Sequence, residues 1–394
     1  MMSTALLLAL AAFMLALVHA LVMEGWRSAI RSGVRSKKPI ADHERQLPSI
    51  SVIIPARDAA DTITPLLQDL YAQDLPHDRY EVIVVDDHST DGTDAIVERM
   101  QKSWSGSRSI KLQDEIGKKA AIMRAAEEAY HDVIVITDAD ARCGRSRLST
   151  IAAHWAETRP DMLLMPVAMS TAEGILGWLQ RKEQIALQAV TAGSALMGAP
   201  ILANGANMAF SRSTFFQLNG FRNDRFSSGD DMFLLQRMRR SGKRIGYLLD
   251  PEVVIRVEPE RSWKAAWQQR ARWAGKMRAY RDPMMLFGSI VALLLPWILA
   301  IISIEVFRRI EVGEGLANAT ALIVCACLFW AVPIVRLVHA MEMFFAKSSE
   351  IPARTGAAAW LSTIPALIAF MIYSPIIAIV SIFVRPIWKG RRIR

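Results

Sequence analysis

The sequence predicts an α/β domain with a mostly parallel sheet, carried on about four transmembrane helices. Between residues 48 and 282, short apolar runs alternate with helical stretches, a pattern typical of a parallel sheet that helices cover on both faces. Outside that region, each of four uncharged runs is long enough to cross a hydrocarbon core of about 30 Å. These runs span residues 4–23, 284–304, 316–335 and 355–384.

Basic residues directly after the first apolar run predict its orientation. A secretory signal peptide carries its positive charge in front, whereas here the charge follows, as Arg27, Arg31, Arg35, Lys37 and Lys38. The positive-inside rule then puts the N-terminus outside and the next domain in the cytoplasm, at the inner or plasma membrane if the source is bacterial. Three further crossings would leave the basic tail 385–394 outside, against the same rule, unless one late segment is re-entrant or interfacial.

Composition narrows the class of function. The net charge of +9 fits attraction of juxtamembrane segments to anionic lipid headgroups, and we expect no nucleic-acid partner because the sequence has no nucleic-acid-binding module. Cys143, Cys325 and Cys327 have no metal-ligand spacing and imply no disulfide framework, which suits a cytoplasmic domain. The 7 histidines are scattered, so a zinc site is not expected.

Repeated strand–helix units are predicted for the first half of the domain. We expect strands at 51–54, 80–85, 132–136 and 161–165, and helices at 61–71, 93–104, 118–130 and 147–157. In such sheets, ligands bind beyond the carboxyl ends of the strands. The residues that follow the first three strands are therefore the first candidates for a site: Arg57 with Asp58, the pair Asp86–Asp87, and Asp138-Ala139-Asp140.

The pattern changes after residue 165. We expect a long helix over 174–196, a turn at 204–207, short helices over 212–219 and 230–240, and two short strands at 247–249 and 253–257. The chain then divides into an N-terminal transmembrane helix (1–25), a basic linker (26–48), the α/β domain (49–258), interfacial amphipathic helices (259–282), a C-terminal transmembrane region (283–384) and the basic tail (385–394).

Asp138 and Asp140 are separated by one residue at a strand end. In an extended backbone, positions i and i+2 point to the same side, so both carboxylates can meet one divalent cation and a nucleotide. Mg²⁺ and Mn²⁺ prefer hard oxygen ligands of this kind. The alternative is a turn in which one carboxylate caps the next helix. In the preceding unit, one aspartate of the acidic turn that begins with Asp86–Asp87 can accept from the N3–H of a uracil, while Asp91 is expected to act as a turn or helix cap.

Two other predicted helix starts carry charge. Lys118 follows Gly117, where a lysine and a helix N-terminus together favour phosphate, although an ordinary solvated helix start fits equally well. Asp230 and Asp231 adjoin each other, and burial of one such carboxylate raises its pKa, which makes it a useful general base near neutral pH. The alternative is that a helix N-terminus simply favours acidic residues.

Gln269, Arg272 and Trp273 share one helix face at positions i, i+3 and i+4. The arginine fork binds phosphate oxygens in pairs, and a tryptophan ring stacks on the apolar face of a sugar. An anchoring helix at the membrane surface is the competing interpretation, because Trp and Arg are also enriched there.

In combination and in order, these motifs resemble glycosyltransferase family 2, of the GT-A fold, in its membrane-embedded branch. This branch includes synthases of chitin oligosaccharide, hyaluronan, poly-N-acetylglucosamine and cellulose, and ceramide glucosyltransferases. The matching pieces are Pro55-Ala56-Arg57-Asp58, Asp86-Asp87, Gly117-Lys118, Asp138-Ala139-Asp140, Asn204-Gly205-Ala206-Asn207, Gly229-Asp230-Asp231 and Gln269-Arg270-Ala271-Arg272-Trp273.

The resemblance implies a Rossmann-like GT-A domain that binds a UDP-sugar. Asp87, with Asp58 nearby, would bind the uracil and ribose, and Lys118 would approach the nucleotide. Asp138 and Asp140 would hold the ribose, the diphosphate and Mg²⁺ or Mn²⁺, with Asp140 favoured as the metal ligand.

The resemblance also implies roles on the acceptor side. Asp231, next to Asp230 as a further candidate, would be the general base that deprotonates the acceptor hydroxyl. Gln269, Arg272 and Trp273 would form the acceptor and diphosphate clamp. Asn207 would line the donor-sugar pocket. Inversion of an α-linked donor would then give a β-linked product.

Several readings of the acceptor remain open. The acceptor is a lipid or a growing saccharide, and a membrane part of about four spans favours single transfer or short chains over a processive polysaccharide synthase with coupled translocation. A homo-oligomer or an accessory subunit could still complete a channel.

A non-catalytic assembly subunit that binds sugar nucleotides would be expected to lack a carboxylate or the clamp, and a nucleotidyltransferase with anchors would carry a Gly-rich phosphate loop.

Overall fold

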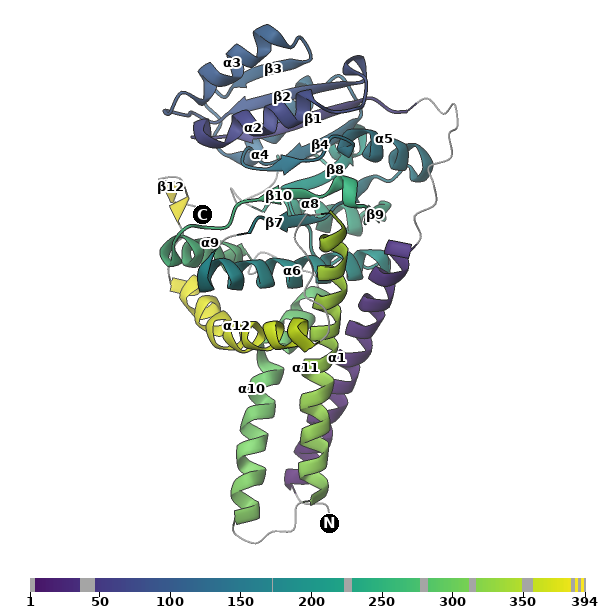
Figure 1. Cartoon of the computed structure of the whole chain (residues 1–394), viewed down its shortest axis with the longest axis vertical. Helices are drawn as coiled ribbons and strands as arrows, with labels where there is room; N and C mark the ends of the chain where they lie inside the picture. Colours follow the sequence, from purple (N-terminus) through teal and green to yellow (C-terminus); the bar gives the residue numbers. More distant parts are fainter. Residues whose placement is uncertain are drawn as a thin grey trace.

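The computed structural model describes residues 4–35, 47–171, 173–222, 229–276, 283–311, 317–348, 357–383, 387–388 and 391–392. Lys37, Lys38 and most of the predicted basic tail lie outside these ranges. Figure 1 shows an α/β domain at one end of the molecule and long helices at the other.

A seven-stranded sheet forms the centre of the α/β domain, in the order β3-β2-β1-β4-β8-β6-β9. The strands β3, β2, β1 and β4 are mutually parallel, whereas β8 runs antiparallel to both of its neighbours. The predicted mostly parallel sheet is therefore confirmed. The strand bounds are β1 Ile50–Ala56, β2 Tyr80–Asp86, β3 Ser107–Lys111, β4 Val133–Thr137, β6 Met162–Leu164, β8 Asn207–Ser211 and β9 Ile245–Tyr247.

Helices cover both faces of this sheet. They are α2 Ala60–Tyr71, α3 Thr93–Ser103, α4 Lys118–Glu128, α5 Arg147–Thr158, α6 Gly174–Leu196, α7 Arg212–Gln217 and α8 Asp230–Arg240, with short 3₁₀ turns η1 His77–Arg79 and η2 Pro251–Val253. A smaller sheet has the order β5-β10-β7. Its strands are β5 Arg142–Cys143, β10 Ile255–Val257 and β7 Val167–Met169.

Alternate residues of β1 belong to two different hydrophobic cores. Ile53 packs in one cluster with residues of α4 and α6, whereas Val52 and Ile54 pack in the other with residues of α2 and α5. Side chains of a strand point alternately to opposite faces, so a strand buried on both faces needs a continuous apolar run. This explains why β1, β2 and β4 were easy to predict from the sequence.

Two strands of the main sheet were not expected from the sequence. β3 lies at the edge of the sheet, and its polar sequence Ser-Arg-Ser-Ile-Lys lacks the apolar run of a buried strand. β8 starts at Asn207, within the stretch predicted as a turn at 204–207. The turn itself is present just before β8, so the error concerns where the turn ends.

Three helices among the described residues are long and apolar enough to cross a membrane. They lie in α1 (Thr4–Arg35), α11 (Ala317–Ser348) and α12 (Ala357–Phe383). Figure 1 shows α10 (Pro283–Glu311) extending in the same direction as α1 and α11, whereas α12 lies across them. α12 contacts both α6 and α9 (Trp263–Lys276), the helix that carries the predicted clamp.

The α/β domain and the long helices share a core. α1 continues to Arg35, past the boundary predicted at residue 25. Ile30 of α1 and Met341 and Phe344 of α11 belong to the main hydrophobic cluster of the domain. The domain is therefore seated directly on these helices, which places α6 and α9 next to the apolar part of the molecule.

Candidate functional site

The carboxyl ends of β1, β2 and β4 meet at one edge of the sheet, because these strands are adjacent and parallel. Asp58, Asp87 and Asp138 each follow one of these ends. The structure therefore brings together the three carboxylates that the strand-end argument singled out. Asp58 adopts a left-handed backbone conformation with φ of 44°, which is uncommon for a residue other than glycine.

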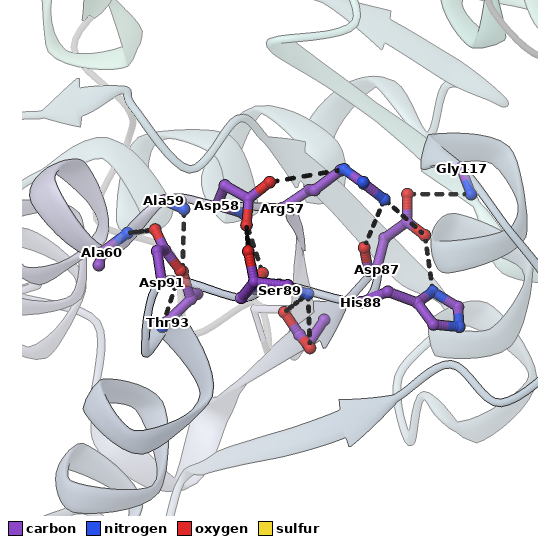
Figure 2. A network of polar contacts seen from close by, with 12 residues as sticks. Arg57, Asp58, Ala59, Ala60, Asp87, His88, Ser89, Asp91, Thr93 and Gly117 are labelled. Atoms are coloured by element: carbon purple, nitrogen blue, oxygen red, sulfur yellow. Dashed lines mark hydrogen bonds and ion pairs between the residues drawn. The ribbon is translucent and has the colours of Figure 1, made fainter. Parts of the chain in front are cut away.

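Asp87 is the buried centre of the network in Figure 2, with 3 % of its surface exposed. Its Oδ2 accepts from the N–H of Gly117 at 3.1 Å, and its Oδ1 lies 3.1 Å from Nδ1 of His88. Arg57 donates from Nη1 to the carbonyl oxygen of Asp87 at 3.1 Å. These contacts fix the end of β2 against the N-terminus of α4. The sequence argument assigned no role to Arg57 or His88, although Arg57 also follows a predicted strand.

The loop after β1 and the loop after β2 are joined by hydrogen bonds beside Asp87. The N–H of Thr90 donates to Oδ1 of Asp58 at 2.9 Å. Asp91 accepts from the N–H of Ala60 at 2.8 Å and from the N–H of Thr93 at 3.0 Å. The capping role expected for Asp91 is thus confirmed. Burial acts to raise the pKa of Asp91, but the hydrogen bonds from Thr93 and Ala60 outweigh burial and lower that pKa.

Lys118 connects two carboxylates from different elements. Its Nζ lies 2.7 Å from Oδ1 of Asp138 and 3.2 Å from Oδ2 of Asp230, and it donates to the carbonyl oxygen of Gly205 at 3.2 Å. Burial disfavours the charged form, but the charges of Asp138 and Asp230 outweigh burial and raise the pKa of Lys118. Lys118 is therefore a fixed positive charge between the end of β4 and the start of α8.

Asp138 and Asp140 differ in their surroundings. The side chain of Asp138 retains 36 % of its accessible surface, yet enough protein surrounds it for desolvation to raise its pKa, with Lys118 opposing the shift and Asp140 adding to it. Asp140 is exposed. No group of three or more His, Cys, Asp or Glu side chains among the described residues could hold a metal ion by itself. The two carboxylates still fit a Mg²⁺ or Mn²⁺ ion, because such ions are commonly held by one or two carboxylates together with substrate phosphates.

The adjacent carboxylates at the start of α8 face different neighbours. Asp230 is 5 % exposed and lies against Lys118, whereas Asp231 is half-buried. Asp231 accepts through Oδ2 from the N–H of Gly205 at 3.2 Å. A Cβ atom at Gly205 would lie 2.7 Å from Oδ2 of Asp230 and 3.1 Å from Nζ of Lys118. The glycine therefore lets the loop before β8 approach both carboxylates.

α9 brings part of the predicted clamp towards these carboxylates. Gln269 donates from Nε2 to Oε1 of Glu260 at 2.9 Å. Arg272 and Trp273 are half-buried. Burial lowers the pKa of Arg272, and the charges of Glu260 and Asp138 act against that shift. Arg272 therefore lies within electrostatic reach of Asp138 at the end of β4.

Asn207 lies inside the fold, at the start of β8. It is 1 % exposed, its Nδ2 donates to the carbonyl oxygens of Pro166 and Val253, both at 2.8 Å, and its Oδ1 accepts from Nη2 of Arg147 at 2.9 Å. These contacts hold β8 in place and give no support to a role in a donor-sugar pocket. Arg147 is itself fully buried and also donates to Oγ1 of Thr137 at 2.9 Å. It was missed because an arginine at a helix start carries no sequence signal of burial.

Comparisons with known proteins extend these observations. Residues 51–217 match the family described as Glycosyl transferase family 2. The beta-monoglucosyldiacylglycerol synthase of Synechocystis sp. is 25% identical over 240 residues, which is 60% of this chain and 49% of that protein. The poly-beta-1,6-N-acetyl-D-glucosamine synthase of Staphylococcus aureus is 22% identical over 244 residues, which is 61% of this chain and 57% of that protein. The chain thus matches only about half the length of these curated relatives.

A solved structure resembles the fold over most of the chain. The mannosyltransferase PcManGT from Pyrobaculum calidifontis, in complex with GDP-Man and Mn²⁺, superposes with a TM-score of 0.55 at 23% identity, covering 87% of this chain and 99% of that chain. The sheet order, the carboxylates at the strand ends and the family match agree with one another. Residues 51–217 therefore form a glycosyl transferase family 2 domain, within a chain that has the GT-A fold and helices suited to a membrane.

Proposed function

We propose that the chain is an inverting membrane hexosyltransferase that acts at the cytoplasmic face. It transfers a sugar from a UDP-sugar, of glucose or N-acetylglucosamine type, to a lipid acceptor. The observation that carries the proposal is the position of Lys118, which links Asp138 of the β4 end to Asp230 of the α8 start. The end of β4, to which we assign the donor, and the start of α8, to which we assign the base, thus lie beside each other. A reaction between two substrates requires such an arrangement.

The nucleotide would lie over the carboxyl ends of β1, β2 and β4. An ionised carboxylate offers about four acceptor sites, so Asp87 can accept from a uracil N3–H in addition to its contacts with Gly117 and His88. Asp58 would contact the ribose. Asp138 and Asp140 would hold Mg²⁺ or Mn²⁺, which when bound neutralises charge on the diphosphate. The Mn²⁺ in the PcManGT complex supports a divalent ion in this fold.

The transfer step then needs no nucleophile from the protein. Asp231 accepts the proton of the acceptor hydroxyl while the hydroxyl oxygen attacks C1 of the sugar. The bond from C1 to the diphosphate oxygen breaks, and UDP leaves with the electron pair. Lys118 and Arg272 stabilise the negative charge that builds on the diphosphate. Because the attack comes from the face opposite the leaving group, an α-linked donor gives a β-linked product.

A lipid acceptor is supported by the position of the clamp helix. α9 contacts α12, which is apolar enough to interact with a membrane. One relative is named beta-monoglucosyldiacylglycerol synthase. The relative named poly-beta-1,6-N-acetyl-D-glucosamine synthase favours a growing saccharide instead. Mass spectrometry of the product separates these acceptors, because a single added hexose indicates a lipid acceptor and a ladder indicates a saccharide chain.

Release of nucleoside diphosphate tests the proposal. The detergent-solubilised protein is incubated with diacylglycerol micelles and with UDP-glucose, UDP-N-acetylglucosamine or GDP-mannose, each with and without Mn²⁺. GDP-mannose is included because PcManGT binds it. We expect release of UDP from one of the UDP-sugars, dependent on the metal ion. Release from GDP-mannose alone would contradict the uracil assignment, and no release from any donor would contradict the transferase itself.

A further inference from the structure

Arg270 lies inside the predicted clamp motif, and its guanidinium group is held by α6 and by its neighbours on α9. Its Nε and Nη2 donate to Oε2 of Glu183 on α6, at 2.8 and 2.6 Å. Its Nη1 donates to Oε1 of Gln269 at 2.9 Å and to Oε1 of Gln180 at 3.3 Å. Both charged side chains are only 9% exposed. The guanidinium group is therefore engaged with α6 and with its own helix, and it is not available to a substrate.

The segment that leads into α9 is tied to the same part of α6. Gln180 donates from Nε2 to the carbonyl oxygen of Glu260 at 2.9 Å and accepts from the N–H of Glu260 at 3.1 Å. The carboxylate of Glu260 in turn accepts from Gln269 at 2.9 Å. Both the start of α9 and its middle are thus held against one face of α6.

The attachment of Arg270 to α6 also determines the direction of the Arg272 side chain. Successive residues of an α-helix are about 100° apart around the axis, so positions two apart point in nearly opposite directions. With Arg270 held against α6, Arg272 is directed to the other side of α9, where it comes within electrostatic reach of Asp138. Removing one member of a buried ion pair leaves an uncompensated charge, so the orientation of α9 depends on this pair.

We propose that Glu183 is a positioning residue for the acceptor clamp: it holds Arg270 and thereby fixes the rotation of α9 that presents Arg272 to the end of β4. Glu183 touches no substrate in this account. The expected effect of Glu183 on sugar transfer rests on the proposed transferase function. The attachment of α9 to α6 can be measured by hydrogen exchange even if the protein transfers no sugar.

The neighbouring residue provides a matched control. Lys182 lies next to Glu183 on α6, is 8% exposed, and pairs with Glu342 of α11 and with Oγ1 of Thr363 of α12. The double variant Lys182→Met/Glu342→Gln removes a buried ion pair from the same turn of α6 without leaving a lone charge. It loosens α6 from the long helices and leaves the contact between α6 and α9 intact.

Four variants test the inference: Glu183→Gln, Arg270→Gln, the charge swap Glu183→Arg/Arg270→Glu, and the control Lys182→Met/Glu342→Gln. Hydrogen exchange of the α9 amides is measured by mass spectrometry, together with sugar transfer and binding of UDP with Mn²⁺. The interaction free energy between two buried residues in contact is commonly large enough to change an equilibrium or a rate by about tenfold. We therefore expect each single variant to accelerate α9 exchange and slow transfer by about tenfold, and to weaken UDP binding by no more than about tenfold, because Arg272 would contact the diphosphate.

The charge swap should restore slow exchange and most of the transfer rate, and the control should leave the α9 amides protected. Unchanged α9 exchange in Glu183→Gln, or a swap no better than the single variants, would overturn the inference. A loss of UDP affinity well beyond about tenfold in Glu183→Gln would also overturn it, because the defect would then exceed the diphosphate contact of one arginine on α9. If wild-type α9 is protected through Glu183 but no donor is consumed, the positioning role stands and the proposed transferase function fails.

Discussion

Asp230 and Asp231 are adjacent in the sequence but suited to different tasks. Asp230 is buried against Lys118, so its charge is committed to that contact. Asp231 is half-buried and accepts from the backbone N–H of Gly205, in the loop that also contacts Lys118. A base must meet the acceptor, and a half-buried carboxylate beside this loop is better placed for that than a buried one.

Replacing Asp231 by Asn tests this assignment. Proton transfer by a positioned base commonly contributes about 10²–10⁴-fold to a rate, so Asp231→Asn should slow sugar transfer by about that factor. Its affinity for UDP should stay within about twofold of wild type. Asp230→Asn is the contrasting variant: because it removes a partner of Lys118, it should weaken UDP binding. Titration calorimetry and a transfer assay separate the two, and normal transfer by Asp231→Asn would exclude it as the base.

Asp91 gives a prediction about stability and pH. Its carboxylate caps the starts of α2 and α3, and loss of such a cap costs about 1 kcal/mol. We expect Asp91→Ala to lower the free energy of unfolding by about this amount at pH 7. Because the hydrogen bonds lower the pKa of Asp91 below its ordinary value of 3.8, the difference should disappear as the pH falls through that lowered pKa.

Thermal unfolding of the two proteins in detergent, followed from pH 7 downwards, measures this difference. Asp114→Ala, which changes an exposed loop carboxylate, is the control and should match wild type throughout. A gap between wild type and Asp91→Ala that persists below the lowered pKa would show that the hydrogen-bonded carboxylate is not its source.

The sequence located the strand-end carboxylates because their position depends only on where a parallel strand stops. The positions of Asp58, Asp87 and Asp138 could be predicted without knowing which elements pack beside each strand. Arg147 and Glu183 could not be found in this way, since their burial depends on which elements pack against α5 and α6. Asn207 shows the same limit, because its amide is occupied by loops distant in the sequence.

Among the elements, α9 carries the arginine that we propose contacts the diphosphate of the donor. An arginine binds a diphosphate through a planar fork, which lysine cannot reproduce although it keeps the charge. We expect Arg272→Lys to slow transfer by about tenfold, because one charge-assisted hydrogen bond contributes about 1.5–3 kcal/mol. Arg261→Lys, the same change at an exposed position just before α9, should have no effect. Equal rates for the two variants would argue that α9 is only an anchor.

Helices and strands could be predicted where a single sequence pattern, such as a long helical period or a continuous apolar run, dominates the segment. α6 was predicted with the bounds that the structure shows, because its length and its mixed face are typical of one long helix. β3 and β8 were missed for different reasons. β3 is a polar edge strand, and β8 begins with an asparagine whose side chain is used inside the fold. Neither property can be read from a local apolar pattern.

At the scale of the whole molecule, α12 bears on the question of topology. Figure 1 shows α12 lying across the other long helices, with the short strand β12 (Arg391–Arg392) on the side of the α/β domain. If α12 lies along the membrane surface, the basic tail ends on the same side of the membrane as the α/β domain, which we propose is the cytoplasmic side, as the positive-inside rule requires. This arrangement favours the interfacial alternative for a late segment over three C-terminal crossings.

Reporter fusions in a bacterial host test this topology. Fluorescent protein and alkaline phosphatase are each joined to the C-terminus, and the same pair is joined after residue 311 as the control for the opposite side. We expect fluorescence and no phosphatase activity at the C-terminus, with the reverse after α10. Phosphatase activity at the C-terminus would instead require α12 to cross the membrane.

An inverting transfer from a UDP-sugar fixes the anomeric configuration of the product, which NMR measures. The purified protein is given a UDP-sugar labelled with ¹³C at C1, with Mn²⁺ and diacylglycerol, and the glycolipid is analysed by NMR. We expect a single β-linked hexose, formed by wild type and not by Asp231→Asn. An α-linked product, or β-linked product in equal yield from Asp231→Asn, would contradict the proposed inverting transfer.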